Sequence, residues 1–547
     1  MKRFAALVLA VVTLASTPAV FAQKARSAKQ SVPSFGNVEG ITAKQLRDYL
    51  TFIASDELEG RDTPSRGLDI AAMYIAQHLS SWGIKPAGGD GTYFQKVPLR
   101  IGKVLSDRTM VEFGGRSFHY GKDFLSAAIR GTVTDAPLVF AGNGWVIKSK
   151  NIDAFSGVDV KDKVVVVTGG LPKGITFQDL KGPQGGDWMS AAFYAQSNGA
   201  KAVITFPNFA GLANWEGTKY NQAEKGLVEF GKPQNTYTIP NLFAAPQMIA
   251  ALFSGEKVSS TTLFNRSITG EPSEAFELAA SKRVSLTVGV DTHDIHTQNV
   301  VGILEGSDPV LKNEYVAIGA HYDHVGTNPY APGADKIWNG ADDDGSGTVS
   351  VLSMAEAFAK GAVRPKRSIL FIWHAGEEKG LWGSEYFSDN PTVPISSIIT
   401  ELNIDMIGRY QNPGDENHPR NKNLPKPGEV FLIGSKLMST ELGEISEATN
   451  KAFLNLSFNY KYDDPNDPEQ YFYRSDHYNY ARKGVPIIFY MDGDHADYHQ
   501  PSDSIEKINF EQMEKVARTI MATGWALANT PSRPKVDKPL QTPSAGN

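Results

Sequence analysis

The segment RSILFIWHAGEEKGL, residues 367–381, joins a strongly apolar run to a pair of adjacent glutamates. The apolar part, SILFIW, is typical of a strand buried in the core. Glu377 and Glu378 follow it almost immediately. Such a pair alone is typical of an exposed turn, because glutamate is rarely buried. At the end of a core strand, the pair also suits a division of roles in which one carboxylate binds a metal and its neighbour transfers a proton.

The same alternation of apolar runs and helical patterns extends over residues 286–530. The strand-like runs are NVVGILEG (299–306), EYVAIGAHYDH (314–324), SILFIWHAGEE (368–378), ITELNIDMIG (399–408) and VPIIFYMDG (485–493). Helical patterns cover 347–360 and 509–528, the second with Met513, Val516 and Ile520 on one face. Strands separated by helices predict an α/β fold with a central, mostly parallel mixed sheet flanked by helices.

A length of 547 residues is too great for one hydrophobic core, so more than one domain is expected. Residues 37–110 contain a predicted amphipathic helix that ends at Gly83, whose apolar face is formed by Leu68, Ala72, Ile75, Leu79 and Trp82. Residues 111–285 have a different pattern, in which short β-rich runs surround one predicted alanine-rich helix. We interpret them as a smaller inserted α/β domain that contains no cluster of metal-ligand residue types. Residues 23–36 and the tail 531–547 are predicted to be disordered.

The first 22 residues, MKRFAALVLAVVTLASTPAVFA, have the pattern of a secretory signal peptide. The apolar stretch is shorter than the ~20 residues that span a membrane, so no membrane span is expected in the mature protein. The chain contains no cysteine, which excludes disulfides, thiolate zinc sites and a cysteine nucleophile. Together these features predict an exported protein of the bacterial periplasm or medium.

The net charge is −6, and it becomes −8 once the lysine and arginine of the leader are removed. This mildly acidic balance argues against a nucleic-acid partner, which normally requires a basic face. No feature of the sequence indicates an oligomeric state.

Several apolar runs end in histidines or acids. The residues at these ends or in the adjoining loops are His321, Asp323, His324, Asp342, Asp343, Asp344, His374, Glu377, Glu378, Asp405, His495 and His499. Each alone has an ordinary explanation, such as a core histidine, a helix-terminal acid or a calcium loop. Because functional groups gather at the carboxyl ends of strands in open α/β sheets, the whole set is expected to converge. Imidazole and carboxylate are zinc ligands, and two zinc ions ~3.5–4 Å apart require a shared carboxylate.

Five ordered motifs resemble the co-catalytic dizinc exopeptidases, a family that includes secreted bacterial aminopeptidases and, more distantly, glutamate carboxypeptidase. These motifs are GAHYDHVG (319–326), NGADDDGSG (339–347), HAGEEKGLWGS (374–384), NIDMIG (403–408) and YHQPSDS (498–504). The segment 58–88 is similar to the N-terminal helices of these enzymes. DVKDKVVVVTGG (159–170) and NGAKAVITF (198–206) resemble a protease-associated domain. The resemblance extends over residues 40–530. It implies a zinc-exopeptidase fold and an aminopeptidase that holds two Zn²⁺ ions and acts on peptides.

The resemblance also implies a role for each matched residue. His321 and Asp405 would bind one zinc, Glu378 and His499 would bind the other, and Asp343 would bridge the two. Asp323 would orient the His321 ring, Glu377 would be the general base, and Tyr498 would stabilise the tetrahedral intermediate. No metal-binding role is assigned to Asp342 or Asp344.

Some assignments stay open at this stage. His495 competes with His499 as ligand, and His324 and His477 are candidates for lining the pocket. The alternative functions are a carboxypeptidase of the glutamate type, in which Arg409 would grip a substrate carboxylate, a single-zinc glutaminyl cyclase, and a non-catalytic receptor-like binding protein.

Overall fold

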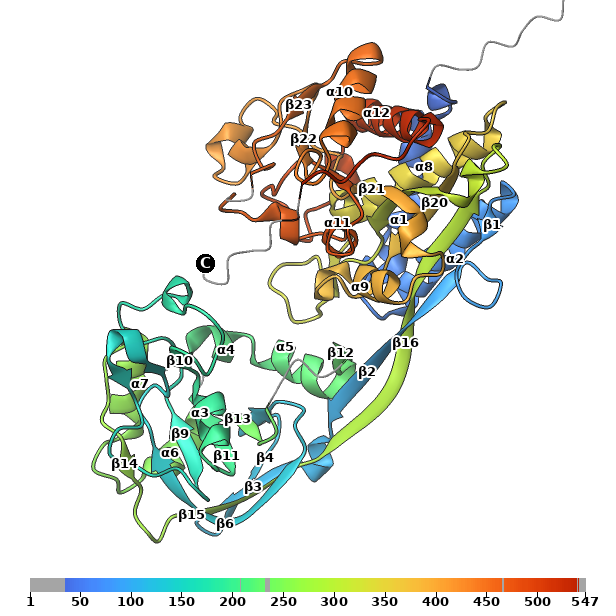
Figure 1. Cartoon of the computed structure of the whole chain (residues 1–547). Coiled ribbons are helices and arrows are strands. Elements are labelled where there is room, and N and C mark those ends of the chain that lie inside the picture. Colours follow the sequence, from blue (N-terminus) through green and yellow to red (C-terminus); the bar gives the residue numbers. More distant parts are fainter. Residues whose placement is uncertain (1–34, 207, 232–236, 465–466, 539, 541–547) are drawn as a thin grey trace, which may run out of the picture.

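The computed structural model describes residues 35–206, 208–231, 237–464, 467–538 and 540. These residues form two lobes, each built on its own sheet (Figure 1). The predicted signal peptide, and residues 23–34 of the segment predicted to be disordered, lie outside the described residues.

The large lobe is built on a mixed sheet. Among the described residues its strand order is β12 (Leu227–Phe230), β2 (Phe94–Val104), β16 (Val290–Leu304), β20 (Ser368–His374), β17 (Tyr315–His321), β21 (Ile398–Ile404), β24 (Ile487–Met491), β22 (Glu429–Ile433) and β23 (Ser457–Asn459), with β1 (Lys85–Pro86) paired to β16. The strands β20, β17, β21 and β24 are parallel neighbours, and antiparallel pairs flank them. The predicted central mixed sheet is confirmed, and its four middle strands are parallel, although five of the nine described strand pairs are antiparallel.

Helices cover both faces of this sheet. Along β17, Val316, Ile318 and Ala320 enter one hydrophobic cluster, whereas Ala317 enters another. The alternation follows from the period of two in a strand, which sends successive side chains to opposite faces. The first cluster contains residues of α1 (Ala43–Ile53), α2 (Arg66–Ser81), α8 (Gly347–Lys360), α10 (Thr440–Ala452) and α12 (Phe510–Asn529). The second contains residues of α9 (Trp382–Asp389) and α11 (His477–Ala481).

The helices predicted from periodicity lie close to their expected positions. The helix predicted over 347–360 is α8, and the one predicted over 509–528 is α12. The helix predicted to end at Gly83 is α2, which begins after Ser65, whose side chain accepts a hydrogen bond from the Leu68 backbone N–H. This N-cap satisfies an otherwise unpaired amide at the start of the helix.

The small lobe is formed by residues from Met110 to Val288. Its described sheet runs β4 (Arg116–His119), β3 (Met110–Phe113), β15 (Arg283–Val288), β6 (Gly131–Phe140), β9 (Val164–Val167), β11 (Ala202–Thr205), β13 (Asn241–Ala244) and β5 (Phe124–Ser126), with β14 (Phe276–Glu277) paired to β6. The helices of this lobe are α3 (Ala191–Ser197), α4 (Phe209–Ala213), α5 (Trp215–Lys219), α6 (Pro246–Phe253) and α7 (Ser260–Thr269). The segments 159–170 and 198–206 therefore supply β9 and β11, and the predicted alanine-rich helix is α3.

Two long strands connect the lobes. β2 and β16 pair along their length, from Val104–Val290 to Phe94–Val300, and run from one lobe into the other (Figure 1). β12 belongs by sequence to the inserted region, yet it pairs with β2 at the edge of the large sheet. A segment of the insertion is therefore held against the large lobe.

Among the residues that the structure describes, none of the helices is both long and apolar enough to cross a membrane. Residues 531–538, within the tail predicted to be disordered, form no helix or strand but contact the large lobe, for example through the Arg533–Glu314 ion pair (2.8 Å).

Candidate metal centre

Four neighbouring parallel strands deliver the candidate ligands to one edge of the large sheet. β17 ends at His321, β20 leads to Glu377 and Glu378, β21 leads to Asp405, and the loop after β24 carries His499. Asp343 is supplied by the helical turn Ala341–Ser346, which precedes α8. The carboxyl ends of parallel strands meet at one edge, so side chains separated by up to 178 positions in the chain become neighbours.

His321, Asp343 and Asp405 form the first part of the centre. The Nε2 atom of His321 lies 3.3 Å from Oδ1 of Asp343 and 3.5 Å from Oδ1 of Asp405. His321 is buried, and burial disfavours its protonation. The carboxylates of Asp405 and Glu377 outweigh this effect and raise the pKa of His321 well above its ordinary value. The site therefore strongly favours a positive charge at this position.

His499, Glu378 and the same Asp343 form the second part. The Nε2 atom of His499 lies 2.8 Å from Oε2 of Glu378 and 3.1 Å from Oδ2 of Asp343. Burial lowers the pKa of His499, but the adjacent carboxylates of Asp343 and Glu378 prevail and raise it to about 10. Asp343 thus presents one carboxylate oxygen to each half of the centre, the placement expected of a bridging ligand.

The residues fit a pair of zinc ions. Within the described part of the chain, the buried atoms His321 Nε2, His499 Nε2 and Asp343 Oδ2 have no hydrogen-bond partner. A buried polar atom without a partner is costly, and a metal ion would satisfy all three. Imidazole nitrogens with carboxylate oxygens are a donor set that zinc accepts.

The two adjacent glutamates diverge from the strand end. Glu378 faces His499 and also His324, whose Nδ1 lies 2.7 Å from Oε1 of Glu378. Glu377 faces the other half of the centre, with Oε2 3.8 Å from Nε2 of His321. Burial raises the pKa of Glu377 well above its ordinary value, and the negative charges of Asp405 and Glu378 add to this shift. A raised pKa is suited to a group that accepts a proton and then donates it.

Asp323 lies behind His321, although its contact differs from the expected one. The backbone carbonyl of Asp323 lies 3.2 Å from Nδ1 of His321, whereas the nearer carboxylate oxygen lies at 3.7 Å. The carboxylate instead accepts hydrogen bonds from the Glu377 backbone N–H (3.2 Å) and the Thr63 hydroxyl (2.9 Å). Asp323 therefore contacts both the imidazole of His321 and the backbone of Glu377.

Tyr498 stacks on the ring of the adjacent His499, with ring centroids 3.9 Å apart. Its side chain lines a small cavity together with Glu377 and Asp405. Burial raises the pKa of Tyr498 above its ordinary value, and the nearby Asp343 and Glu378 reinforce the shift, so the hydroxyl stays protonated and able to donate a hydrogen bond.

Two residues without an assigned ligand role also lie at the centre. His324 groups with Asp343, Glu378 and His499, and Asp344 groups with His321 and Asp405, so that one potential ligand atom of each residue lies within 4.8 Å of the others in its group. Oδ1 of Asp344 already accepts two backbone hydrogen bonds, from Gly347 (2.8 Å) and Met406 (3.0 Å).

Two further histidines considered from the sequence, His495 and His477, lie outside these groups. Nε2 of His495 faces Oδ2 of Asp342 at 3.2 Å, whereas His499 faces the centre. Nε2 of His477 makes a hydrogen bond with the backbone carbonyl of Phe472 (2.8 Å), and burial lowers the pKa of His477 to about 3, which describes a neutral core histidine. This geometry favours His499 over His495 as ligand.

Arg409, the residue considered for gripping a substrate carboxylate, is buried and engaged elsewhere. Its guanidinium donates a hydrogen bond to Asp497 (3.2 Å), and it lines neither of the cavities beside the centre.

Three polar residues around the centre were not singled out from the sequence. Arg61 is fully buried and donates to the carbonyls of Tyr322 (2.9 Å) and Gly340 (3.0 Å), and so ties together the loops that carry His321 and Asp343. Thr63 contacts Asp323, and the Ser475 hydroxyl donates to Oδ2 of Asp405 (2.7 Å). The sequence contained a signal for Arg61 and Thr63, because both belong to the segment 58–88, which resembles the N-terminal helices of the dizinc exopeptidases.

Two cavities adjoin the centre. The smaller, of about 30 Å³, is lined by Asp343, Glu377, Asp405, Met406, Tyr471, Arg474, Ser475, Phe489, Met491, Asp494 and Tyr498. The larger, of about 550 Å³, includes His499 and is bounded by residues of both lobes.

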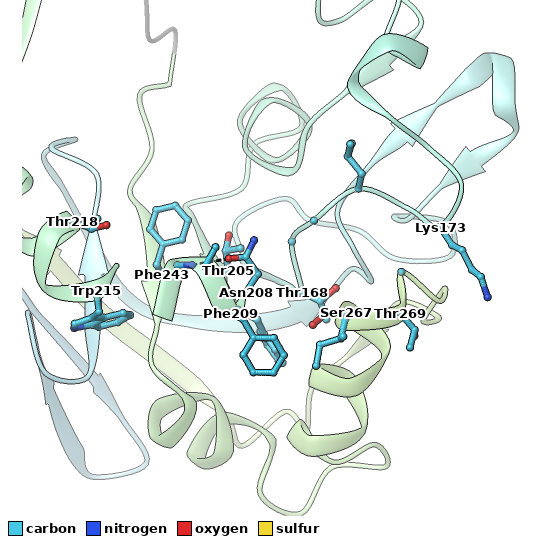
Figure 2. Close-up of a pocket in the computed structure, with 18 of the residues that line it drawn as sticks. Thr168, Lys173, Thr205, Asn208, Phe209, Trp215, Thr218, Phe243, Ser267 and Thr269 are labelled. Carbon is cyan, nitrogen blue, oxygen red and sulfur yellow. Dashed lines mark hydrogen bonds between the residues drawn. The ribbon is translucent and has the colours of Figure 1, made fainter. Parts of the chain in front are cut away.

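A third cavity, of about 760 Å³, lies within the small lobe beyond the carboxyl ends of β9 and β11. Figure 2 shows Thr168 and Thr205 beside Asn208, Phe209, Phe243 and Ser267 there. Its described lining contains no histidine and no acid, so it cannot hold a metal in the manner of the centre described above.

Comparison with known proteins agrees with this geometry. Residues 299–524 match the model of Peptidase family M28. The matched segment contains all five predicted metal ligands and the two adjacent glutamates.

Curated relatives from fungi are similar to part of the chain. A probable zinc metalloprotease of Phaeosphaeria nodorum is 27% identical over 276 residues, which cover 44% of this chain and 54% of that protein. A probable leucine aminopeptidase of Arthroderma benhamiae is 27% identical over 247 residues, covering 43% of this chain and 59% of that protein. The chain thus spans little more than half the length of these relatives.

Solved structures share the fold over most of the chain. An aminopeptidase from Aneurinibacillus sp. strain AM-1 superimposes with a TM-score of 0.52 at 18% identity, covering 93% of this chain and 100% of that one. BSAP, a zinc aminopeptidase from Bacillus subtilis, superimposes with a TM-score of 0.50 at 18% identity, covering 88% and 94%. The predicted fold class is therefore confirmed, while a bacterial origin and the protease-associated identity of the small lobe stay predictions.

Proposed function

We propose that this chain is a zinc-dependent aminopeptidase that removes N-terminal residues from peptides and holds two zinc ions. The observation that carries the proposal is the position of Asp343, whose two oxygens face His321 on one side and His499 on the other. The match to the M28 model and the names of the curated relatives support the same reading.

One zinc ion would be held by His321 and Asp405, and the other would be held by Glu378 and His499. Asp343 would bind both ions. When bound, zinc lowers the pKa of water and polarises a carbonyl group. Glu377 takes the proton from the attacking water and delivers it to the amine that leaves. Asp323 holds the His321 ring and the backbone of Glu377 in place, and the Tyr498 hydroxyl donates to the oxyanion that develops on the carbonyl.

The small cavity supports exopeptidase action. A volume of about 30 Å³ offers room for one small group beside Glu377, such as an amino group. Four acids line it, Asp343, Glu377, Asp405 and Asp494, against one cation, Arg474, which pairs with Asp494 (3.4 Å). This excess of negative charge suits a free α-amino group. The engagement of Arg409 by Asp497 argues against the carboxypeptidase alternative.

We also propose that the protein is exported through its N-terminal leader, and that the small lobe is a protease-associated domain. The pattern of residues 1–22 supports the first proposal, and the order of strand, helix and strand in β9, α3 and β11 supports the second. Expression in a bacterial host with and without residues 1–22, followed by fractionation, tests export.

The enzymatic proposal is tested with purified protein whose metal content is measured. We expect hydrolysis of aminoacyl amides and of peptides with a free N-terminus, no hydrolysis of the same peptides when N-acetylated, and loss of activity on chelation that zinc restores. Cleavage of N-acetylated peptides from the C-terminus would favour a carboxypeptidase, and release of pyroglutamate from an N-terminal glutamine would favour a cyclase. Full activity after exhaustive chelation would contradict the zinc mechanism.

A further inference from the structure

The larger cavity beside the metal centre is formed jointly by the two lobes. The large lobe contributes His499, together with Asp62, Thr63, Val325, Thr327, Asn328, Trp338 and Lys379. The inserted region contributes Asn221 and Lys225 of the helical segment Tyr220–Lys225, Gly226, and Leu227 and Val228 of β12. Figure 1 shows α5 and β12 at the junction between the lobes. A volume of about 550 Å³ lies in the range typical of sites for small molecules.

The inserted wall of this cavity is held in a defined position. β12 pairs with β2 from Leu227–Gly102 to Phe230–Leu99. The ring of Phe230 stacks on that of Trp382 in the large lobe, with centroids 6.1 Å apart. The turn before β12 needs the positive φ of Gly226 (94°), where a Cβ would lie 2.7 Å from the Ile101 side chain. Lys225 is therefore carried on a fixed piece of backbone.

The charges that line the cavity are unbalanced. Lys225 and Lys379 both form ion pairs with the single carboxylate of Asp62, the second at 2.8 Å. Each lysine side chain keeps about a third of its surface exposed, whereas that of Asp62 is 6% exposed. Apart from His499, no other charged residue lines this cavity in the described part of the chain. The lining therefore carries two lysines against one carboxylate, and because Asp323 and Glu378 also attract Lys379, Lys225 is the lysine left to face a ligand.

The two cavities adjoin different halves of the metal centre. The smaller cavity adjoins Asp405 and is suited to the α-amino group of the N-terminal residue. The larger cavity adjoins His499, so it receives the part of the peptide that leaves. A peptide carboxylate is ionised at neutral pH, and its desolvation is compensated only where a cation or N–H group faces it.

We propose that the larger cavity recognises a carboxylate on the leaving part of the substrate, and that Lys225 and Lys379 are the residues that select it. Because it rests on the proposed aminopeptidase function, this inference narrows the substrates to short peptides with a carboxylate one or two residues after the scissile bond. The carboxylate can come from the C-terminus of a dipeptide or tripeptide, or from an acidic side chain. The inserted region is then a determinant of specificity.

The test compares three leucyl substrates on the full-length, zinc-loaded protein. These are leucyl-glycine, leucyl-glycinamide and the α-amide of leucyl-glutamate, which carries a carboxylate only on its side chain. We expect kcat/KM for leucyl-glycine to exceed that for leucyl-glycinamide by about tenfold, the size of one hydrogen bond to a charged group. Lys225→Met should reduce this ratio several-fold and act mainly on KM. The rate for the α-amide of leucyl-glutamate shows whether the cavity prefers a C-terminal carboxylate or a side-chain carboxylate.

A matched control and a binding measurement complete the experiment. Lys219→Met removes a lysine of the same inserted segment that pairs with Glu216 outside the cavity, and it should leave the ratio unchanged. In Glu377→Gln protein, which should bind these peptides without hydrolysing them, calorimetry should give a lower dissociation constant for leucyl-glycine than for leucyl-glycinamide. Equal kcat/KM for all three substrates, with no effect of Lys225→Met, would overturn this inference and leave the aminopeptidase proposal intact. Failure to hydrolyse any of the three would overturn both.

Discussion

At the scale of single residues, the centre depends on neighbours in sequence that face different ways. Glu377 and Glu378 follow Gly376, whose φ of 76° lies in a region that glycine adopts readily. The chain turns there, and the two carboxylates point to opposite halves of the centre. This geometry allows a ligand and a proton carrier to occupy consecutive positions.

Replacing Glu377 by glutamine tests the role of general base. Glutamine keeps the size of the side chain but cannot accept a proton, so we expect kcat to fall at least about 100-fold. Bound zinc and the thermal midpoint should change little, as measured by elemental analysis and circular dichroism. Glu511→Gln, an exposed change in the first turn of α12, is the control. Turnover at the wild-type rate in the Glu377 variant would exclude it as the base.

The adjacent acids Asp343 and Asp344 are distinguished by a second pair of variants. Burial raises the pKa of Asp344 well above its ordinary value, and its Oδ1 accepts two backbone hydrogen bonds. Asparagine can preserve those contacts, so Asp344→Asn should retain its zinc. Asp343→Asn removes a charge that faces both histidines and should lower the zinc content to one ion per chain or fewer. Equal loss of zinc in both variants would show that Asp344 also acts as a ligand.

At the scale of elements, the loop between β24 and α12 has to place His499 against residues from three other strands. Asp497 anchors this loop. Its carboxylate contacts Lys507 and the Ser502 hydroxyl (2.6 Å), and accepts a hydrogen bond from Arg409 (3.2 Å). Burial disfavours the ionised form of Asp497, but the hydrogen bonds from Lys507 and Ser502 prevail and lower its pKa to about 2.

The depressed pKa of Asp497 makes its contribution to stability dependent on pH. Because the unfolded carboxyl binds protons at higher pH than the folded one, the contribution is present above about pH 4 and is lost as the pH falls toward 2. We expect Asp497→Asn to lower the free energy of unfolding by about 2 kcal/mol at neutral pH, and the difference from wild type to shrink below pH 4. Urea unfolding at pH 7, 5 and 3.5 measures it.

The control for this change is Asp48→Asn, which removes an ion pair with Lys44 that is largely exposed. Exposed pairs contribute little to stability, so this variant should unfold almost as the wild type does at every pH. If Asp497→Asn behaved in the same way, the proposed anchoring of the loop would be wrong.

At the scale of the whole molecule, the two lobes have separate hydrophobic clusters. The clusters of the large lobe are drawn from residues 38–84 and 300–528 and from 301–491, whereas those of the small lobe lie between residues 104 and 290. The candidate metal ligands all belong to the large lobe. Metal binding is therefore expected to stabilise one lobe and not the other.

Calorimetric unfolding with and without a chelator tests this division. At a free zinc concentration 100 times its dissociation constant, the metal stabilises the folded lobe by about 2.7 kcal/mol. Chelation should therefore lower the midpoint of one transition and leave the other in place. A return of zinc should reverse the shift. Equal displacement of both transitions would mean that the lobes unfold as one unit.

The local chemistry of this chain could be predicted from its sequence. Strand runs, helical periodicity and the position of acids and histidines after apolar runs depend on neighbours within a few residues. The predicted helices α2, α8 and α12 and the strands β17, β20 and β21 lie where expected for this reason. The five motifs likewise supplied the candidate ligands His321, Asp343, Glu378, Asp405 and His499, which the fold brings together.

Contacts between distant segments were decided only by the tertiary structure. The approach of Asp342 to His495, of Arg409 to Asp497 and of Asp344 to Met406 depends on how loops from different strands pack. No local pattern encodes such distances, since each loop position follows from the packing of the whole sheet. The pairing of β12 with β2 is of the same kind, and it brings Lys225 from the inserted region to the cavity beside His499.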